Sequence, residues 1–280
     1  MVQSINQHKT APFIHSGHST AYRYLFTSLA LAPVLLAFVY YLGIFILLNV
    51  VVAVFLSIIL EIVCLLINKA DWRFHIKDGH AMLTGLMIGL MAGPDTGFLF
   101  ITTACVFAIV VAKHAYGGLG KYIFHPAMAG IAFAYLCFPS EFADINTQTY
   151  QWLPFLWLLG GTFLWQQKII HWQIPIAGIM GLLTIDISFQ LLQIELYYAS
   201  AYIPLSGYTL FCLFFLATDS TCTPSSNSEK WFYGLLTGAI LYIMYLYSDS
   251  VTSIAATILI MNVVSLLIEY LGEYKRQTSA

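Results

Sequence analysis

Ten apolar stretches, each of about 14 to 24 residues, follow one another along the chain and are separated by short polar or Gly/Pro-containing breaks. A membrane-spanning helix needs roughly 20 mainly apolar residues. The stretches lack the period-two alternation of strands. The sequence therefore predicts an all-α polytopic membrane protein with about ten transmembrane helices. The expected spans are 24–42, 44–67, 79–93, 97–115, 124–138, 152–165, 173–192, 200–218, 231–247 and 251–270.

The composition excludes most other classes of protein. Only 9% of the residues are charged and 60% are hydrophobic, whereas a soluble domain carries about 25% charged residues. A soluble enzyme, a disordered chain and a disulfide scaffold are thus ruled out. A net charge of -2 gives no basic face for nucleic acid. The five cysteines are scattered in apolar runs and suggest no metal site.

The basic residues test the proposed spans. Lys and Arg favour cytoplasmic loops, and all 11 fall before the first span, after the last, or in alternate loops. The opposite loops contain acidic residues and no Lys or Arg. We therefore expect a multi-pass membrane protein with both termini cytoplasmic. The basic residues are Lys9, Arg23, Lys69, Arg73, Lys77, Lys113, Lys121, Lys168, Lys230, Lys275 and Arg276.

The two halves of the chain show a weak internal repeat. Asp78-Gly79 opens an apolar run that ends at Gly93-Pro94, and Gly207 opens one that ends at Thr223-Pro224. Five spans per half predict two inverted repeats with broken helices, which place binding sites near the repeat interface. The alternative is that Gly and Pro simply punctuate these helices. The predicted segments are a cytoplasmic N-terminal segment 1–23, repeats 24–138 and 152–270, an extracytoplasmic loop 139–151 and a cytoplasmic tail 271–280.

Three places along the chain are candidate sites. The loop with Gly117, Gly118 and Gly120 precedes a helix that begins near Pro126, a pattern able to host an anion or a planar ring, or simply to form a tight turn. Carboxylates in apolar surroundings are costly and therefore candidate ion-path residues. These carboxylates are Glu61 and Asp219, although Asp219 could instead cap the following loop.

Four blocks of sequence, in order, resemble motifs of the RnfD/NqrB family of membrane subunits. The family motifs read P-H-x-x-S-G-x-S, D-G-S-A-x-x-T-G-L, G-G-L-G-x-N-x-F-N-P-A and A-T-D-P-x-T-S-P. The resemblance implies a ten-helix fold of inverted repeats, similar to urea and ammonium transporters. It also implies flavin-mediated electron transfer coupled to Na+ or H+ movement, with other Rnf subunits as partners. The matching blocks here are Pro12–Thr20, Asp78–Leu86, Gly117–Ala127 and Ala217–Pro224.

The chain departs from the family pattern around the expected flavin site. Members of the family link FMN to a threonine in a S-G-A-T-x-L motif, which should follow Phe138-Pro139, and this motif is missing. Thr149 is the nearest positional candidate. Tyr122 and His125 replace family asparagines, and Ser220 replaces a proline. We interpret these changes as loss or weakening of covalent FMN attachment on a retained helical scaffold.

Two main hypotheses follow. The first is a subunit of an Rnf-type ion-translocating complex, with FMN as the expected cofactor and no enzyme activity of its own outside the complex. The second is a stand-alone small-solute channel or transporter, motivated by the repeat and the missing flavin motif. An assembly factor or degenerate paralogue is a third possibility.

Overall fold

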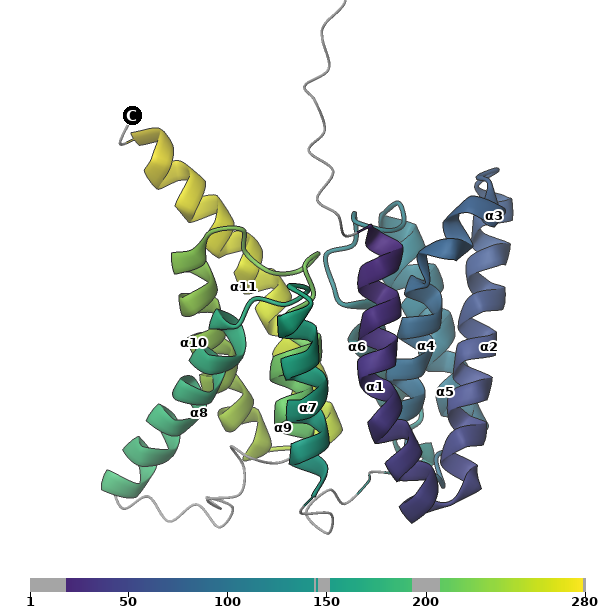
Figure 1. Ribbon diagram of the computed structural model, residues 1–280, viewed down its shortest axis with the longest axis horizontal. Coiled ribbons are helices and arrows are strands. Elements are labelled where there is room, and N and C mark those ends of the chain that lie inside the picture. Colours follow the sequence, from purple (N-terminus) through teal and green to yellow (C-terminus); the bar gives the residue numbers. More distant parts are fainter. Residues whose placement is uncertain (1–18, 144, 146–151, 193–206, 279–280) are drawn as a thin grey trace, which may run out of the picture.

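The computed structural model describes residues 19–143, 145, 152–192 and 207–278, and these form helices joined by short turns, without a strand (Figure 1). Helices stand at every predicted span; of the span predicted at 200–218, only residues 207–218 are described. The all-α prediction is therefore confirmed. The α-helices are α1 Thr20–Leu42, α2 Ile44–Ile67, α3 Trp72–His75, α4 His80–Met91, α5 Phe98–Val106, α6 Pro126–Cys137, α7 Leu153–Gln166, α8 Gln173–Leu191, α9 Gly207–Phe211, α10 Asn227–Tyr245 and α11 Ser250–Thr278.

Short segments of other helical types complete the long elements. Two π-helical segments, η2 and η7, continue α5 and α9. In the described connections lie three 3₁₀ turns, η1, η3 and η4. Their bounds are η1 Ile76–Asp78, η2 Phe107–Lys113, η3 His114–Tyr116, η4 Pro139–Glu141 and η7 Cys212–Leu216.

Five of the described helices are long and apolar enough to cross a membrane by themselves, and three shorter helices are also apolar. Large apolar side chains lie exposed on their outer surfaces, for example Phe55 on α2 and Phe155 on α7. This arrangement is what a lipid-facing surface requires, and the protein is a multi-pass membrane protein. The five long spans are Thr20–Leu42, Ile44–Ile67, Phe98–Tyr116, Gln173–Leu191 and Ser250–Gly272.

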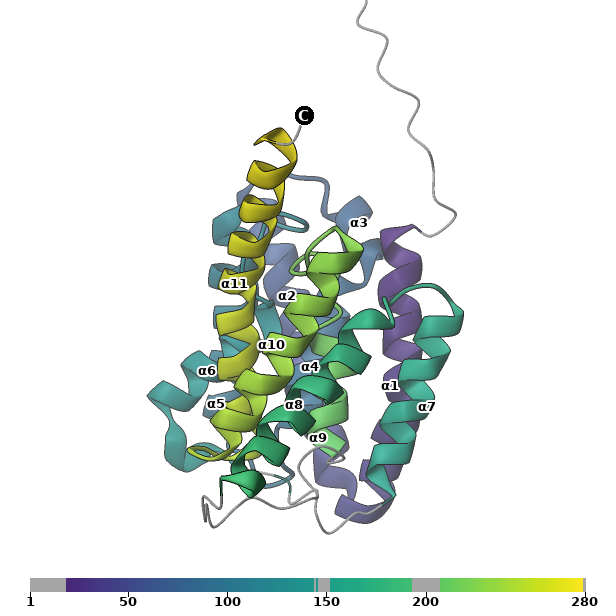
Figure 2. The same cartoon turned by 90° about the vertical axis from the view of Figure 1, so that its left-hand side faces the viewer.

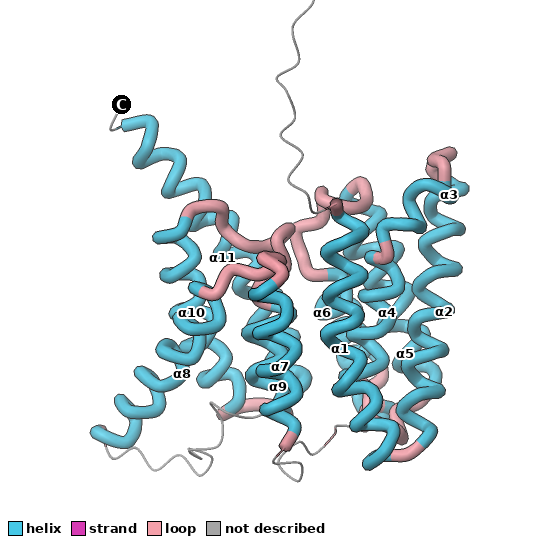
Figure 3. The backbone as a smooth tube through the Cα atoms, in the orientation of Figure 1, coloured by secondary structure: helices cyan, strands magenta, loops and turns pink. Residues whose placement is uncertain are grey.

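The helices form two sets that lie side by side, α1 to α6 and α7 to α11 (Figures 1 and 2). Across the boundary the first helices of the two sets, α1 and α7, are in contact, and so are the last helices, α6 and α11. α1 begins at the upper end of Figure 1 and α7 at the lower end, so the first helices run in opposite directions. The loops gather at the two ends of the helices (Figure 3). The domain boundaries given above stay a prediction.

α4 is a broken, buried helix inside the first set. Its 12 residues rise about 18 Å, well short of the roughly 30 Å hydrocarbon core. Gly79, with a φ of 74°, turns the chain from η1 into α4. At the other end the Asn49 amide Nδ2 donates to the carbonyl oxygens of Gly93 and Pro94, at 3.0 and 3.3 Å. These contacts tie the turn that follows α4 to the neighbouring helix α2.

Two helix pairs approach each other through glycine. On α4, a Cβ added at Gly89 would lie 2.5 Å from the Cα of Val50 on α2. On α10, a Cβ added at Gly238 would lie 1.9 Å from the carbonyl oxygen of Gly178 on α8. Small residues at such spacings allow membrane helices to pack closely. The pairs α2/α4 and α8/α10 are therefore fixed by backbone contact.

Two basic residues are buried, which the sequence did not predict. Lys113 and Lys230 were expected in loops, but Lys113 ends η2 and Lys230 lies in the first turn of α10. Both are buried, with 2% and 5% of their surface exposed. Lys113 is buried because it pairs with a carboxylate, and the sequence alone does not reveal that pair.

Candidate functional site

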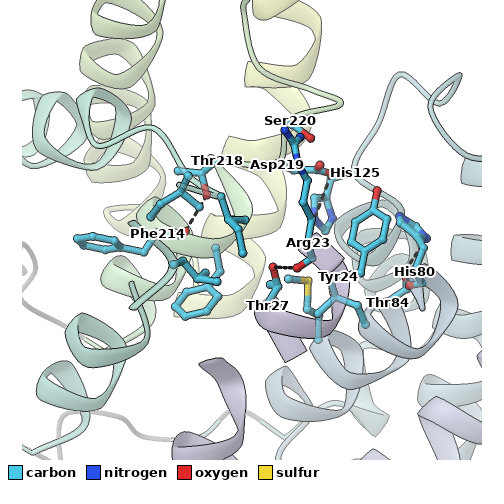
Figure 4. A pocket seen from close by; sticks show the side chains of 16 residues that line it. Arg23, Tyr24, Thr27, His80, Thr84, His125, Phe214, Thr218, Asp219 and Ser220 are labelled. Carbon is cyan, nitrogen blue, oxygen red and sulfur yellow. Dashed lines mark hydrogen bonds and ion pairs between the residues drawn. The ribbon is translucent and has the colours of Figure 1, made fainter. Parts of the chain in front are cut away.

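A small cavity lies between the two helix sets, near the end at which α1 begins (Figure 4). Its volume of about 50 Å³ has room for a few water molecules. Apolar side chains form much of the wall, and polar groups converge on it from α1, α4, the start of α6 and the loop after η7. The polar lining includes Arg23, Tyr24, His80, His125 and Asp219.

Local backbone features position these side chains. His80 is the first residue of α4 because Gly79 makes the turn before it. His125 immediately precedes Pro126, a residue suited to the first helical position of α6. Asp219 is held by a local turn in which its Oδ1 accepts a hydrogen bond from the Thr221 backbone N–H at 3.2 Å.

The Tyr122 hydroxyl is the centre of a buried polar cluster. It donates to Thr221 Oγ1 at 3.0 Å or to Asp219 Oδ2 at 3.3 Å, and it lies 3.2 Å from His80 Nε2. Burial and the Asp219 carboxylate raise the pKa of the Tyr122 hydroxyl well above its usual range. The phenol therefore stays protonated, and three neighbours compete for its one proton.

His125 completes the cluster from the other side of Asp219. Its Nε2 lies 3.9 Å from Asp219 Oδ2, and the two side chains point toward each other (Figure 4). Its Nδ1 is buried and has no hydrogen-bond partner within the described part of the chain. Burial lowers the pKa of His125, and the Asp219 carboxylate opposes part of that shift. A water molecule in the adjoining cavity would satisfy Nδ1.

Glu61 lies in a second, separate polar cluster near the end of α2. Lys113 Nζ donates to Glu61 Oε1 at 2.7 Å, and His114 Nε2 lies 3.0 Å from Oε2. The π-helical winding ends at Lys113 and a 3₁₀ turn begins at His114, which brings two consecutive side chains to one carboxylate. π-helical segments occur frequently at functional sites. Glu61 does not line the cavity, so the structure does not bring the two predicted ion-path residues together.

The three loop glycines adopt left-handed backbone conformations, as the sequence pattern suggested. The φ angles of Gly117, Gly118 and Gly120 are 105°, 91° and 80°. The N–H groups of Gly117 and Gly118 already donate to the carbonyl oxygens of His114 and Lys113. The loop therefore closes the end of the helix that carries Lys113, and these two N–H groups are not available to a phosphate.

The small cavity beside Asp219 is not itself a flavin site. A cavity of about 50 Å³ is far below the roughly 300–1,000 Å³ of sites for molecules of drug size. Tyr122 and His125, which replace the family asparagines, fill the region beside Asp219 with bonded side chains. Thr149, the positional candidate for attachment, lies outside the described residues.

Sequence reasoning identified Glu61 and Asp219 but missed most of their partners. Lys113 was interpreted only as a marker of loop orientation, and His114 and His80 were not singled out. Glu61 and Lys113 are 52 residues apart along the chain, and Asp219 and Tyr122 are 97 residues apart, so no local pattern joins them. The Lys113-His114 pair at the end of an apolar run is the signal that could have suggested a buried carboxylate partner.

Comparison with known proteins gives one family and a consistent set of relatives. The sequence model of the NQR2, RnfD, RnfE family matches residues 7–154 and 142–277. The D-type subunit of the ion-translocating oxidoreductase complex of Aliivibrio salmonicida is 27% identical over 333 aligned positions, covering 93% of this chain and 95% of that protein. Its counterpart in Buchnera aphidicola is 27% identical, covering 86% and 90%. The counterpart in Actinobacillus succinogenes is 26% identical, covering 93% and 94%.

The relatives are longer than this chain. An alignment of 333 positions with a chain of 280 residues contains more than 50 positions at which the Aliivibrio protein has no counterpart here. The expected covalent flavin motif is missing from this sequence. This chain therefore aligns with most of the relative's length but lacks counterparts to a substantial number of its residues.

Proposed function

The chain belongs to the NQR2, RnfD, RnfE family, and from this premise we propose that it is the D-type membrane subunit of an ion-translocating oxidoreductase complex. The observation that carries the proposal is the match of the family along nearly the whole chain, with relatives of this description covering 86 to 93% of it. The subunit supplies a helical scaffold and part of the path by which electron transfer in the complex drives Na+ or H+ across the membrane. A stand-alone solute channel is not supported by these relatives.

Glu61 and Asp219 are the proposed ion-path residues of this subunit. Both lie near the end of the helical body that carries the basic residues, Glu61 against Lys113 and Asp219 beside the cavity. A buried carboxylate bound by a lysine can change its partner when an ion or proton arrives, because the pair is costly to keep in an apolar region. Asp219 has the water-sized cavity next to it as an entry point.

The subunit works without a covalently attached flavin. The resemblance implies FMN, but the S-G-A-T-x-L motif that carries the covalent bond in the family is missing from this sequence. Ultraviolet fluorescence of the denatured protein in a gel tests this point, and a fluorescent band at its mass would contradict it. Gly117, Gly118, Gly120 and Thr149 would then be the first residues to test for flavin contact.

The proposed location is the bacterial inner membrane, with both termini in the cytoplasm and the other membrane and peripheral subunits of the complex as partners. Affinity purification from mild detergent tests the assembly. Subunits of an oxidoreductase complex should co-purify in fixed ratio. A protein that is reproducibly isolated alone, and that conducts a solute when reconstituted alone, would contradict the proposal.

Ion movement itself is tested in the assembled complex. Glu61→Gln and Asp219→Asn should each lower ion translocation per electron transferred, since each removes a charge that the path uses. Asp95→Asn, an exposed acidic residue, is the matched control and should leave translocation unchanged. If both path variants translocate as well as the control, these residues are not on the path.

A further inference from the structure

Helices α8 and α10 begin side by side, at the end of the second set that carries basic residues. Gln173 Nε2 lies 3.5 Å from Asn227 Oδ1, and the rings of Trp172 and Trp231 meet edge to face with their centroids 5.6 Å apart. Both helices lie on the outer side of the second set, and both begin toward the upper end of Figure 1 (Figures 1 and 2). Neither helix start is capped by a side chain. The positive ends of two helix dipoles therefore meet at one place on the surface.

Lys230 is a buried cation at this place. It lies in the first turn of α10 with 5% of its surface exposed. Its ammonium group makes no hydrogen bond or ion pair with any residue that the structure describes. Lys113, which is also buried, has Glu61 at 2.7 Å. Glu229 adds a negative charge beside Lys230, but consecutive residues of a helix do not face each other. A buried charge without a bonded partner is costly, so the site favours an anion from outside the chain.

Other basic side chains surround the same place. Burial and the positive charges of Lys230 and Arg23 lower the pKa of His171, which lies in the connection between α7 and α8. Basic groups from three segments therefore lie close enough to influence one another. Lys168 is exposed in the same connection. Arg23 also lines the cavity with Asp219, so we count it as a source of positive field here and not as a ligand.

The surface that continues from this basic cluster is apolar. Ile176 and Met180 on α8 and Phe232 on α10 are exposed. Trp172, which is also exposed, stands between these apolar side chains and the basic residues. Tryptophan favours the level of the lipid headgroups in a bilayer. A headgroup at the helix starts with acyl chains along α8 and α10 matches this order of side chains, whereas a soluble anion makes no use of the apolar face.

Gln173 indicates what the headgroup carries besides a phosphate. Its Oε1 is buried and has no hydrogen-bond partner within the described part of the chain. A phosphate diester offers only acceptor oxygens, so it cannot satisfy this atom. The glycerol headgroup of phosphatidylglycerol adds hydroxyl groups, which can donate to Oε1.

We propose that the adjoining starts of α8 and α10 form a binding site for an anionic phospholipid with a hydroxyl-bearing headgroup, with its phosphate at Lys230 and a hydroxyl donating to Gln173. Basic pockets between membrane helices bind anionic headgroups in this way, and helix starts favour phosphate. The long stem of Lys230 lets its ammonium reach the headgroup level while the stem stays buried. The bound lipid compensates Lys230 and holds the two helix starts together.

Native mass spectrometry of the full chain in detergent tests the lipid and the lysine. The wild-type protein should retain phosphatidylglycerol in preference to phosphatidylcholine. Lys230→Gln should bind phosphatidylglycerol about fivefold more weakly, and Lys230→Arg should keep the preference. Lys121→Gln, which removes an exposed lysine of the first set, is the matched control and should bind as the wild type does. Equal retention of the two lipids by the wild type, or unweakened binding by Lys230→Gln, would overturn the proposal.

Tryptophan fluorescence locates the site even if Lys230→Gln fails to fold. Phosphatidylglycerol with brominated acyl chains should quench the wild-type protein more than brominated phosphatidylcholine, because Trp172 and Trp231 flank the site. The excess should disappear when both are changed to Phe. If the excess persists in that double variant, the lipid binds elsewhere and the proposal fails.

Two competitors separate the lipid from other anions. Inorganic phosphate at the concentration of the lipid should not remove the excess quenching, since it lacks acyl chains; full displacement would assign the site to a soluble anion. The excess should also persist in the assembled complex. Its loss there would assign the site to an acidic segment of a partner subunit and overturn the lipid proposal.

Discussion

At the scale of single residues, the molecule places a buried carboxylate and a half-buried one in differently compensated sites. Glu61 is bound to Lys113 and His114, and Asp219 faces Tyr122 and His125. A paired buried charge is tolerated, but removal of one partner leaves the other uncompensated. The stability of the first helix set should therefore depend on keeping Glu61 and Lys113 together.

Glu61→Gln should lower the free energy of unfolding by about 3–5 kcal/mol, because Lys113 then stays buried without its carboxylate. Lys113→Met alone should cost about as much, whereas the double variant should recover much of the loss. Thermal unfolding of the purified protein in detergent measures all three. Additive losses in the double variant would show that the two side chains do not form a stabilising pair.

His125 should make the stability of the folded protein depend on pH, and the direction follows from its pKa shift. Burial lowers its pKa below the ordinary 6.5, so the folded state favours the neutral imidazole. The unfolded chain binds more protons than the folded chain below that value, and stability therefore falls as the pH drops below about 6.5 and is fully present above it. His125→Asn should flatten the difference in melting temperature between pH 7 and pH 5. If the melting temperature of the variant changes by the same amount between pH 7 and pH 5, other groups cause the pH dependence.

At the scale of elements, the positions of the helices could be predicted closely and the polar contacts could not. The expected spans 44–67 and 173–192 coincide with α2 Ile44–Ile67 and α8 Gln173–Leu191, because the length of an apolar run decides where a helix crosses a bilayer. The partners of Glu61 depend on the packing of α2 against η2, 52 residues away. The π-helical winding brings Lys113 and His114 to the same carboxylate, and no feature of the hydropathy pattern predicts it.

Helices α8 and α10 pack closely because glycines, which have no side chain, lie at their contact. Gly238→Ala would place a methyl group 1.9 Å from the carbonyl oxygen of Gly178, so the two helices must move apart. We expect a loss of about 1–3 kcal/mol, as for overpacking in other cores. The same change should weaken the Tyr242–Asp186 bond, which crosses this pair. The melting temperature measures the first effect; Leu136→Ala, at a site that is 81% exposed, is the control and should change it little.

At the scale of the whole molecule, the charge asymmetry and the opposed directions of the two sets give one consistent topology. The basic residues define one end, and α1 and α7 run in opposite directions between the two ends. This topology places the cavity and Glu61 near the basic end. The side of the membrane on which each end lies follows from the preference of basic loops for the cytoplasm.

Labelling of intact cells checks that orientation. In a Cys137→Ser background, which removes the exposed native cysteine, Ser140→Cys should react with an impermeant maleimide added outside, because Ser140 is exposed at the end without basic residues. Lys121→Cys, exposed in the glycine loop at the basic end, should react only after the membrane is opened. Lys113 is unsuited to such labelling because it is buried against Glu61. Reaction of Lys121→Cys from outside would invert the topology.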